Sequence, residues 1–130
     1  MFLKRQRYFA AAALGLAAAL AVTDYVPGIC FKYHAACYMT HSAIEATRTL
    51  RTRHGLAPGD VGTVDVWVNE GHFGVCNILV PATGLEAKFS LRLTVALALA
   101  GADTASIDLY TDALAASPDL VALRDRITVR

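Results

Sequence analysis

The side chains best suited to chemistry gather in residues 31–46, which read FKYHAACYMTHSAIEA. The first eleven of these positions hold a lysine, two histidines, a cysteine and two tyrosines. Such a density of titratable groups is unusual in a chain that is 55% hydrophobic and 18% charged. Helices that only build a core do not need these groups, whereas catalytic and substrate-binding surfaces often do. We therefore expect this segment to form part of a functional site.

Two residues of the segment have both a functional and a structural interpretation. Lys32 lies in a stretch otherwise suited to burial, so its ammonium must pair with an anion or reach solvent. It is either an anchor for a substrate carboxylate or an ordinary lysine at the start of a helix. His41 follows on the same helix. Because histidine exchanges protons near neutral pH, it is either a proton carrier or an interface histidine with satisfied hydrogen bonds.

A zinc site is an alternative reading of the same segment, because Cys30, His34, Cys37 and His41 recur at helical spacing. On one helix the outer two would lie about 16 Å apart. Tetrahedral zinc holds each ligand at about 2.0–2.3 Å. A straight helix can supply two such ligands, so we expect no metal. The chain also lacks the Cys-x-x-Cys, phosphate-loop and dinucleotide-binding glycine motifs, and we expect no cofactor.

The composition limits the class of protein. A chain of 130 residues is expected to form one domain, and its net charge of +1 gives no basis for nucleic-acid binding. Three cysteines, Cys30, Cys37 and Cys76, do not make a disulfide framework. Their odd and sparse count favours a reducing compartment, and hence the cytoplasm.

Residues 1–23 form a segment of different character. Lys4, Arg5 and Arg7 precede an apolar run from Tyr8 to Val22, which is the outline of a secretory signal peptide. The run is shorter than the roughly 20 residues that cross a membrane, so we expect no stable membrane span. The alternative is an alanine-rich helix that normally packs inside a larger protein.

The remaining residues alternate between helical and strand patterns, which predicts a small α+β domain with several helices and a short sheet. Apolar positions predict a helix from Ala36 to about His54, ended by Gly55. Residues 61–69 alternate as a strand with one buried face, and residues 70–82 are interpreted as a loop with a short helix. A strand at 127–129 ends the chain without a predicted partner.

Three further helices are predicted in the second half. A capping box at Thr83–Glu86 precedes a helix that reaches Ala100 and is apolar on nearly every face from Ala87 onward. Such a helix is expected to be buried in a larger body, and to be exposed if this chain stands alone. A weaker helix is predicted over 103–116. The last, over 118–125, has Ser117 as its N-cap.

Two separated blocks resemble a known family. Residues 31–46 are similar to the lysine-to-histidine motif of the MmgE/PrpD family, which includes 2-methylcitrate dehydratase and cis-aconitate decarboxylase. Residues 86–91, EAKFSL, resemble a second conserved block of that family, and VDV at 64–66 lies between them at a fitting distance. The resemblance covers about residues 24–130.

The resemblance implies a fold and a set of site residues. Family members have a large helical domain and a smaller α+β lid domain, with the active site between them. This chain resembles most of the lid domain at 24–130, with 1–23 as a remnant of an upstream helix. Lys32, Cys37 and Lys88 are then expected to bind a di- or tricarboxylate, with His41 as the catalytic residue.

Two positions depart from the family pattern. The decarboxylase branch has a histidine where this chain has Cys37, which favours a dehydratase-like member of propionate catabolism. A tyrosine is frequent at the position of Leu93, and its absence removes a hydroxyl that could contact substrate.

The resemblance also bears on activity. Removing water from a hydroxy acid requires a base for the α-proton and an acid for the leaving hydroxyl, and the helical domain supplies much of this machinery. We therefore expect the isolated chain to be an inactive lyase fragment, whose partner is a second copy or a chain carrying the helical domain. The alternative is a non-catalytic carboxylate-binding or interaction module, exported if residues 1–23 act as a signal peptide.

Overall fold

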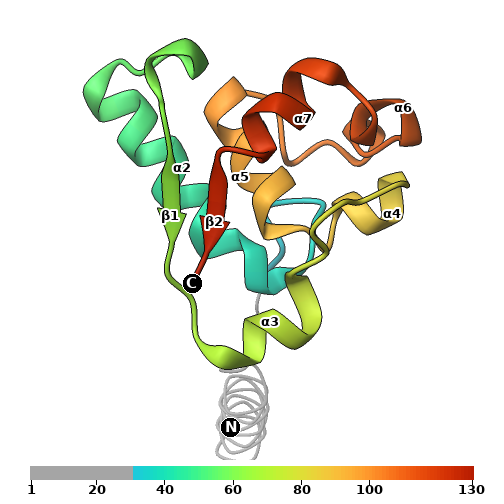
Figure 1. The fold of residues 1–130 in the computed structure, drawn as a ribbon. Coiled ribbons are helices and arrows are strands. Elements are labelled where there is room, and N and C mark those ends of the chain that lie inside the picture. Colours follow the sequence, from blue (N-terminus) through green and yellow to red (C-terminus); the bar gives the residue numbers. More distant parts are fainter. Residues whose placement is uncertain (1–30) are drawn as a thin grey trace, which may run out of the picture. The chain divides into compact units, whose positions relative to one another are not determined.

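The computed structural model describes residues 31–130, and two helices, α2 (His41–His54) and α5 (Leu91–Ala100), are its longest elements. They pack against each other near the middle of the fold (Figure 1). The other α-helices are α3 (Glu70–Cys76), α4 (Gly84–Ala87), α6 (Asp112–Ala115) and α7 (Pro118–Arg124). The strands are β1 (Val64–Val66) and β2 (Ile127–Val129). Short 3-10 turns occupy η1 (Tyr38–Thr40), η2 (Pro58–Asp60) and η3 (Ile107–Leu109). The predicted α+β class is confirmed.

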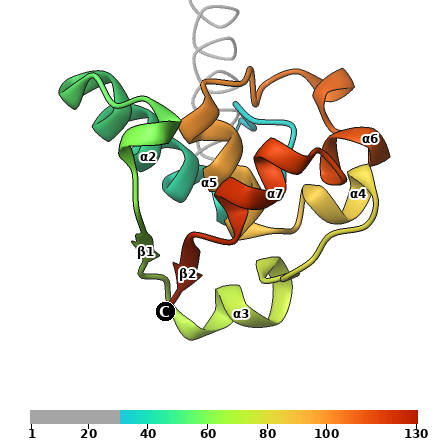
Figure 2. The same ribbon diagram turned by 45° about the horizontal axis from the view of Figure 1, so that its top comes forward.

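Helix α5 is the centre of the domain. It contacts α2, α7 and β2, and Figure 2 shows these elements arranged around it. Eight of its ten residues are buried, and Arg92 and Ala100 are the two that are not. We expected this apolar helix to be exposed in the chain alone, and that expectation is wrong. Residues 32–130 form one compact unit, and within it the helix packs against α2, α7 and β2.

The largest group of buried side chains joins α5 to the segment that precedes α2. Leu93 and Leu97 of α5 pack with Ala36, Ile44 and Tyr110. Burying a leucine or isoleucine side chain contributes about 1.5–3 kcal/mol. This packing fixes the residues around position 36 against the core.

Helix α2 begins later than predicted. Residues 38–40 form the 3-10 turn η1, and the α-helix starts at His41 instead of Ala36. Its end is as predicted, because Gly55 adopts a left-handed conformation with φ 61°. Only part of its apolar surface is buried, since Ile44 is fully buried while Leu50 is 54% exposed.

The two strands form a parallel pair, so the prediction of an unpaired terminal strand is wrong. Val64 lies opposite Ile127, and Val66 lies opposite Val129. The Val68 N–H extends the pairing by donating to the Arg130 carbonyl at 2.9 Å. The regular strand is shorter than the predicted 61–69, but the alternation holds: the valines are half-buried and the residues between them are exposed.

The predicted helix up to Ala100 is divided into two. The Thr83 hydroxyl accepts a hydrogen bond from the Glu86 N–H at 3.2 Å and caps the short helix α4. The Glu86 carboxylate accepts from the Ala82 N–H instead of completing the capping box. The chain then turns, and the Ser90 hydroxyl accepts from the Leu93 N–H at 3.3 Å to begin α5.

The predicted helix over 103–116 is wrong in most of its length. The turn η3 and the four-residue helix α6 occupy parts of it, while Thr104 and Tyr110 are buried. Helix α7 starts at Pro118 as predicted, although the Ser117 side chain makes no capping hydrogen bond.

The predictions for residues 1–23 and for Cys30 lie outside the described residues, so the predicted domain boundary at 24 stays a prediction. Within residues 31–130, no helix is both long and apolar enough to cross a membrane.

Candidate functional site

A pocket of about 440 Å³ opens where three separate segments meet. The first segment precedes η1, the second is the turn between α4 and α5, and the third is the loop that follows α5. The lining residues are Lys32, His34, Ala35, Ala36, Cys37, Lys88, Phe89, Ala105 and Ile107. The two blocks singled out in the sequence therefore meet in space.

Backbone hydrogen bonds hold the three segments together. The Cys37 N–H donates to the Lys88 carbonyl at 2.9 Å, which joins the first segment to the second. The Ala35 N–H donates to the Thr104 carbonyl at 2.9 Å, which joins the first to the third. Main-chain bonds of this kind position the lining without using its side chains.

Three of the four predicted site residues line this pocket: Lys32, Cys37 and Lys88. The fourth, His41, is not part of the lining. Leu93, where the family pattern has a tyrosine, is fully buried in the core and is also not part of the lining. The replacement of the family's tyrosine by Leu93 therefore changes the core. It does not change the described lining of the pocket.

The charged groups of the lining suit an anion. Lys32 and Lys88 contribute ammonium groups, and no aspartate or glutamate is among the lining residues described. The Lys88 Nζ lies 5.5 Å from the centre of the Tyr110 ring, within the range of a cation–π contact. Tyr110 is itself buried, so it gives the half-buried Lys88 a fixed surface to lie on.

His34 is the histidine that lines the pocket, and both of its ring nitrogens have neighbours. Nδ1 forms a hydrogen bond with the Thr104 hydroxyl at 2.9 Å. Nε2 lies 2.9 Å from Glu45 Oε1, at ion-pair distance but off the line that a hydrogen bond requires. Burial and then the neighbouring His41 lower the pKa of His34, while Glu45 opposes that change. A buried imidazole with a lowered pKa and one nitrogen hydrogen-bonded to Thr104 is suited to positioning more than to exchanging protons.

His41 lies at the start of α2, behind the pocket wall. Its ring meets the ring of His34 edge-on, with centroids 4.9 Å apart, and that of Tyr38 at 5.3 Å. Its Nε2 is buried and makes no hydrogen bond within the described part of the chain. The role of His41 as a proton carrier stays a prediction.

Cys37 and Cys76 bring two thiols together. The sulfur atoms lie 3.1 Å apart, and both cysteines are free. Cys76 is fully buried beside Leu91 and Val129. Burial raises the pKa of the Cys76 thiol to about 12, and the hydrogen bond with Cys37 acts in the same direction.

The zinc set suggested by the spacing does not assemble among the residues described. No three side chains of the histidine, cysteine, aspartate or glutamate type gather there in a way that could hold a metal ion. Cys30, the remaining member of that set, lies outside the described residues.

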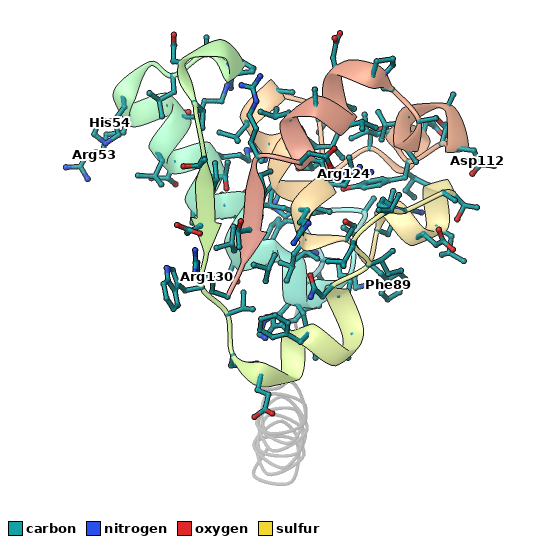
Figure 3. All side chains as sticks on the ribbon, in the orientation of Figure 1. Arg53, His54, Phe89, Asp112, Arg124 and Arg130 are labelled. Atoms are coloured by element: carbon teal, nitrogen blue, oxygen red, sulfur yellow. The ribbon has the colours of Figure 1, made fainter. Side chains whose placement is uncertain are left out.

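The last turn of α2 carries three basic residues outside the pocket lining, Arg51, Arg53 and His54. Arg53 and His54 extend outward from the end of the helix, on the opposite side of the view from Phe89 of the pocket (Figure 3). Both are exposed. Cations at this end of a helix suit the negative end of its dipole.

Reasoning from the sequence missed several residues of the pocket. His34 was assigned no role in binding the ligand, and the lining residues Ala105 and Ile107 fell within the wrongly predicted helix over 103–116. The same helix contained Thr104 and Tyr110, which contact the lining residues His34 and Lys88. Their types carry no pattern that would have placed them beside Lys88. Their positions follow from the irregular loop after α5, which the local sequence does not indicate.

Comparison with known proteins identifies one family. The family model described as the MmgE/PrpD C-terminal domain matches residues 34–130. Lys32 precedes the matched range, whereas Cys37, His41 and Lys88 lie within it. A search of curated proteins finds no match to the chain.

Proposed function

The chain belongs to the MmgE/PrpD family, with residues 34–130 as the C-terminal domain, and from this premise we propose that its pocket binds a di- or tricarboxylate. The domain then forms the cationic wall of the active site of a 2-methylcitrate dehydratase-like lyase. The resemblance implies that a helical domain forms the opposite wall.

One observation carries this proposal. Lys32 and Cys37 come from one sequence block and Lys88 from another, about 50 residues later, yet all three line the same pocket. Charge-assisted hydrogen bonds from lysine to carboxylate are stronger than neutral ones. A pocket with two lysines and no carboxylate in its described lining favours a ligand with more than one negative charge.

The residues have distinct proposed roles. Lys32 and Lys88 each hold a carboxylate group of the ligand. Cys37 contributes to the wall of the pocket, where the decarboxylase branch has a histidine. His41 is the proposed proton carrier, and it adjoins the pocket through its contact with the ring of His34.

The same geometry supports the expectation that the 130-residue chain does not turn over substrate alone. Elimination of water needs both a base and an acid near the reacting atoms. The described lining holds no carboxylate, and His34 is buried, with its Nδ1 hydrogen-bonded to Thr104. Incubation of the purified chain with 2-methylcitrate, followed by absorbance of the unsaturated product, should show little or no turnover. Robust turnover would contradict this part of the proposal.

Binding can be tested separately from turnover by titrating the chain with citrate in a calorimeter. We expect Lys32→Met and Lys88→Met each to weaken binding about tenfold or more, since a hydrogen bond to a charged group contributes about 1.5–3 kcal/mol. Arg53→Met is the matched control, because it removes the same charge from an exposed position outside the pocket lining. Equal affinity in all three variants would overturn the proposed site.

A second candidate function is a non-catalytic carboxylate-binding or interaction module. The buried state of α5 favours it, because residues 32–130 close their own core. Adding the helical domain of a family member, or co-expressing a neighbouring gene that encodes one, distinguishes the two. Restored turnover supports a lyase in two parts, whereas citrate binding without turnover supports the module.

We also propose a cytoplasmic location, on the basis of the sparse cysteines. N-terminal sequencing of protein recovered from cells tests it. A chain that starts at Val22 would instead show processing and export.

A further inference from the structure

The pair of thiols at the pocket wall has a geometry that the proposed carboxylate site does not use. Cys37 is half-buried and lines the pocket, while Cys76 lies behind it at the end of α3 and is fully buried. Their sulfur atoms are 3.1 Å apart, although 39 positions separate them in the sequence. One thiol therefore adjoins the pocket, and the other is closed off from solvent.

We propose that Cys37 and Cys76 are a site of reversible oxidation, at which Cys37 meets a peroxide and Cys76 closes a disulfide with it. This proposal does not depend on which ligand the pocket binds. Intracellular disulfides, where they occur, are usually transient and serve catalysis or redox sensing.

The surroundings of Cys37 and Cys76 indicate which of the two thiols reacts first. Reactive cysteines are partly exposed and lie in electropositive surroundings, whereas buried structural cysteines are inert. Cys37 shares its pocket with Lys32 and Lys88. Cys76 lies among apolar side chains, and burial raises its pKa to about 12, so it stays protonated at neutral pH. Cys37 is thus the thiol that attacks, and Cys76 is the one that resolves.

The chemistry balances with hydrogen peroxide as the oxidant. The Cys37 sulfur attacks one peroxide oxygen, the O–O bond breaks, and the products are Cys37 sulfenic acid and one water. The Cys76 sulfur then attacks the Cys37 sulfur, the S–O bond breaks, and the thiol proton leaves with the hydroxyl as a second water. Both thiols are oxidised by two electrons in total, and the peroxide is reduced to two waters.

Closing the disulfide requires a small movement of the two cysteines toward each other. A disulfide bond is about 2.05 Å long, so the sulfur atoms must approach by about 1 Å. Cys37 is held by the hydrogen bond from its N–H to Lys88, and its carbonyl accepts bonds from the N–H and hydroxyl of Thr40. The three residues before Cys76 in α3 are exposed, whereas the chain after it is held by the Ile78 N–H, which donates to the Phe89 carbonyl at 3.2 Å. The closed bond would tie α3 to the pocket wall.

The test uses the full chain carrying Cys30→Ser, which leaves the pair as the only cysteines. After treatment with hydrogen peroxide, mass spectrometry of proteolytic peptides should find Cys37 joined to Cys76, and dithiothreitol should reverse the link. The thermal unfolding midpoint should rise on oxidation, because a cross-link restricts the unfolded chain. Persistence of both free thiols, or links only between chains, would overturn the proposal.

Two further variants test the assigned order. With Cys76→Ala, Cys37 should stop at sulfenic acid and be captured by dimedone, whereas the unsubstituted pair should give much less of that adduct. With Cys37→Ala, Cys76 should resist peroxide. Equal oxidation of Cys76 with and without Cys37 would refute the order. If a variant fails to fold, peptide mapping of the peroxide-treated unsubstituted chain still tests the pairing, since Cys37 and Cys76 must lose their free thiols together.

Discussion

Helix α5 and the pocket wall at residues 32–37 differ in what holds them in place. The helix is held by apolar packing on nearly all sides, with eight of its ten residues buried. The wall is held by individual hydrogen bonds, such as the one from the Cys37 N–H to Lys88, and it leaves Lys32 exposed. Ala36 links the two, because it packs in the same cluster as Leu93. The core thus provides the stability that lets polar groups at its edge remain available to a ligand.

The largest effect should follow from a cavity in the core. Leu97 is 1% exposed and belongs to the main buried cluster, so Leu97→Ala should lower the free energy of unfolding by about 2–5 kcal/mol. Urea unfolding measures this change. Leu50→Ala is the control, because Leu50 is 54% exposed and should change stability by no more than about 0.5 kcal/mol. Similar losses in both variants would mean that α5 is not the main source of stability.

A smaller loss is expected where α4 meets the segment before α6. A Cβ added at Gly84 would meet the backbone carbonyl of Tyr110, and the Gly84 N–H also donates to Asp112 Oδ1 at 2.7 Å. Gly84→Ala should therefore cost about 1–3 kcal/mol. Gly62→Ala, with nothing within 4 Å of its Cβ, should be nearly neutral. Comparison of the two unfolding midpoints in urea checks this, and a neutral Gly84→Ala would disprove the close approach.

A third change tests how α5 begins. The buried Ser90 hydroxyl caps the helix, so Ser90→Ala should cost about 1 kcal/mol. Ser117→Ala is a matched control, because Ser117 is the N-cap of α7 but its side chain makes no capping bond. Thermal unfolding of the two variants should differ in this direction. An equal loss would mean that the Ser90 hydrogen bond adds nothing to the packing.

The smallest effect concerns the pocket wall and pH. Burial lowers the pKa of His34, so the unfolded chain binds its proton more tightly than the folded chain does. Stability contributed by neutral His34 is therefore present above its ordinary pKa of 6.5 and declines as the pH falls below that value. His34→Gln should flatten the dependence of unfolding free energy on pH in this range, whereas His54→Gln, at an exposed position, should not. An unchanged slope in His34→Gln would show that another group titrates.

The sequence predictions are correct where neighbouring residues determine the structure, and they fail where residues far apart in the sequence determine it. The ends of α2 and α5 at Gly55 and Gly101, and the start of α7 at Pro118, depend on residues within one turn. The break between α4 and α5 was missed, because an alternating apolar run fits one long helix as well as two short ones. The loop containing Thr104 was predicted as helix for a similar reason: its conformation depends on partners such as His34, 70 positions away.

The periodicity of the sequence by itself determined the α+β class. Its two motif blocks carried the resemblance to the family, and that resemblance implied three of the residues that line the pocket, Lys32, Cys37 and Lys88. Only the tertiary structure decided which residues meet. It brought Lys88 to Cys37, placed His34 instead of His41 at the pocket and put Cys76 behind Cys37. It also paired the last strand with β1 and buried α5 within this domain. These outcomes rest on packing and hydrogen bonds between distant segments, which a pattern of neighbouring residues does not contain.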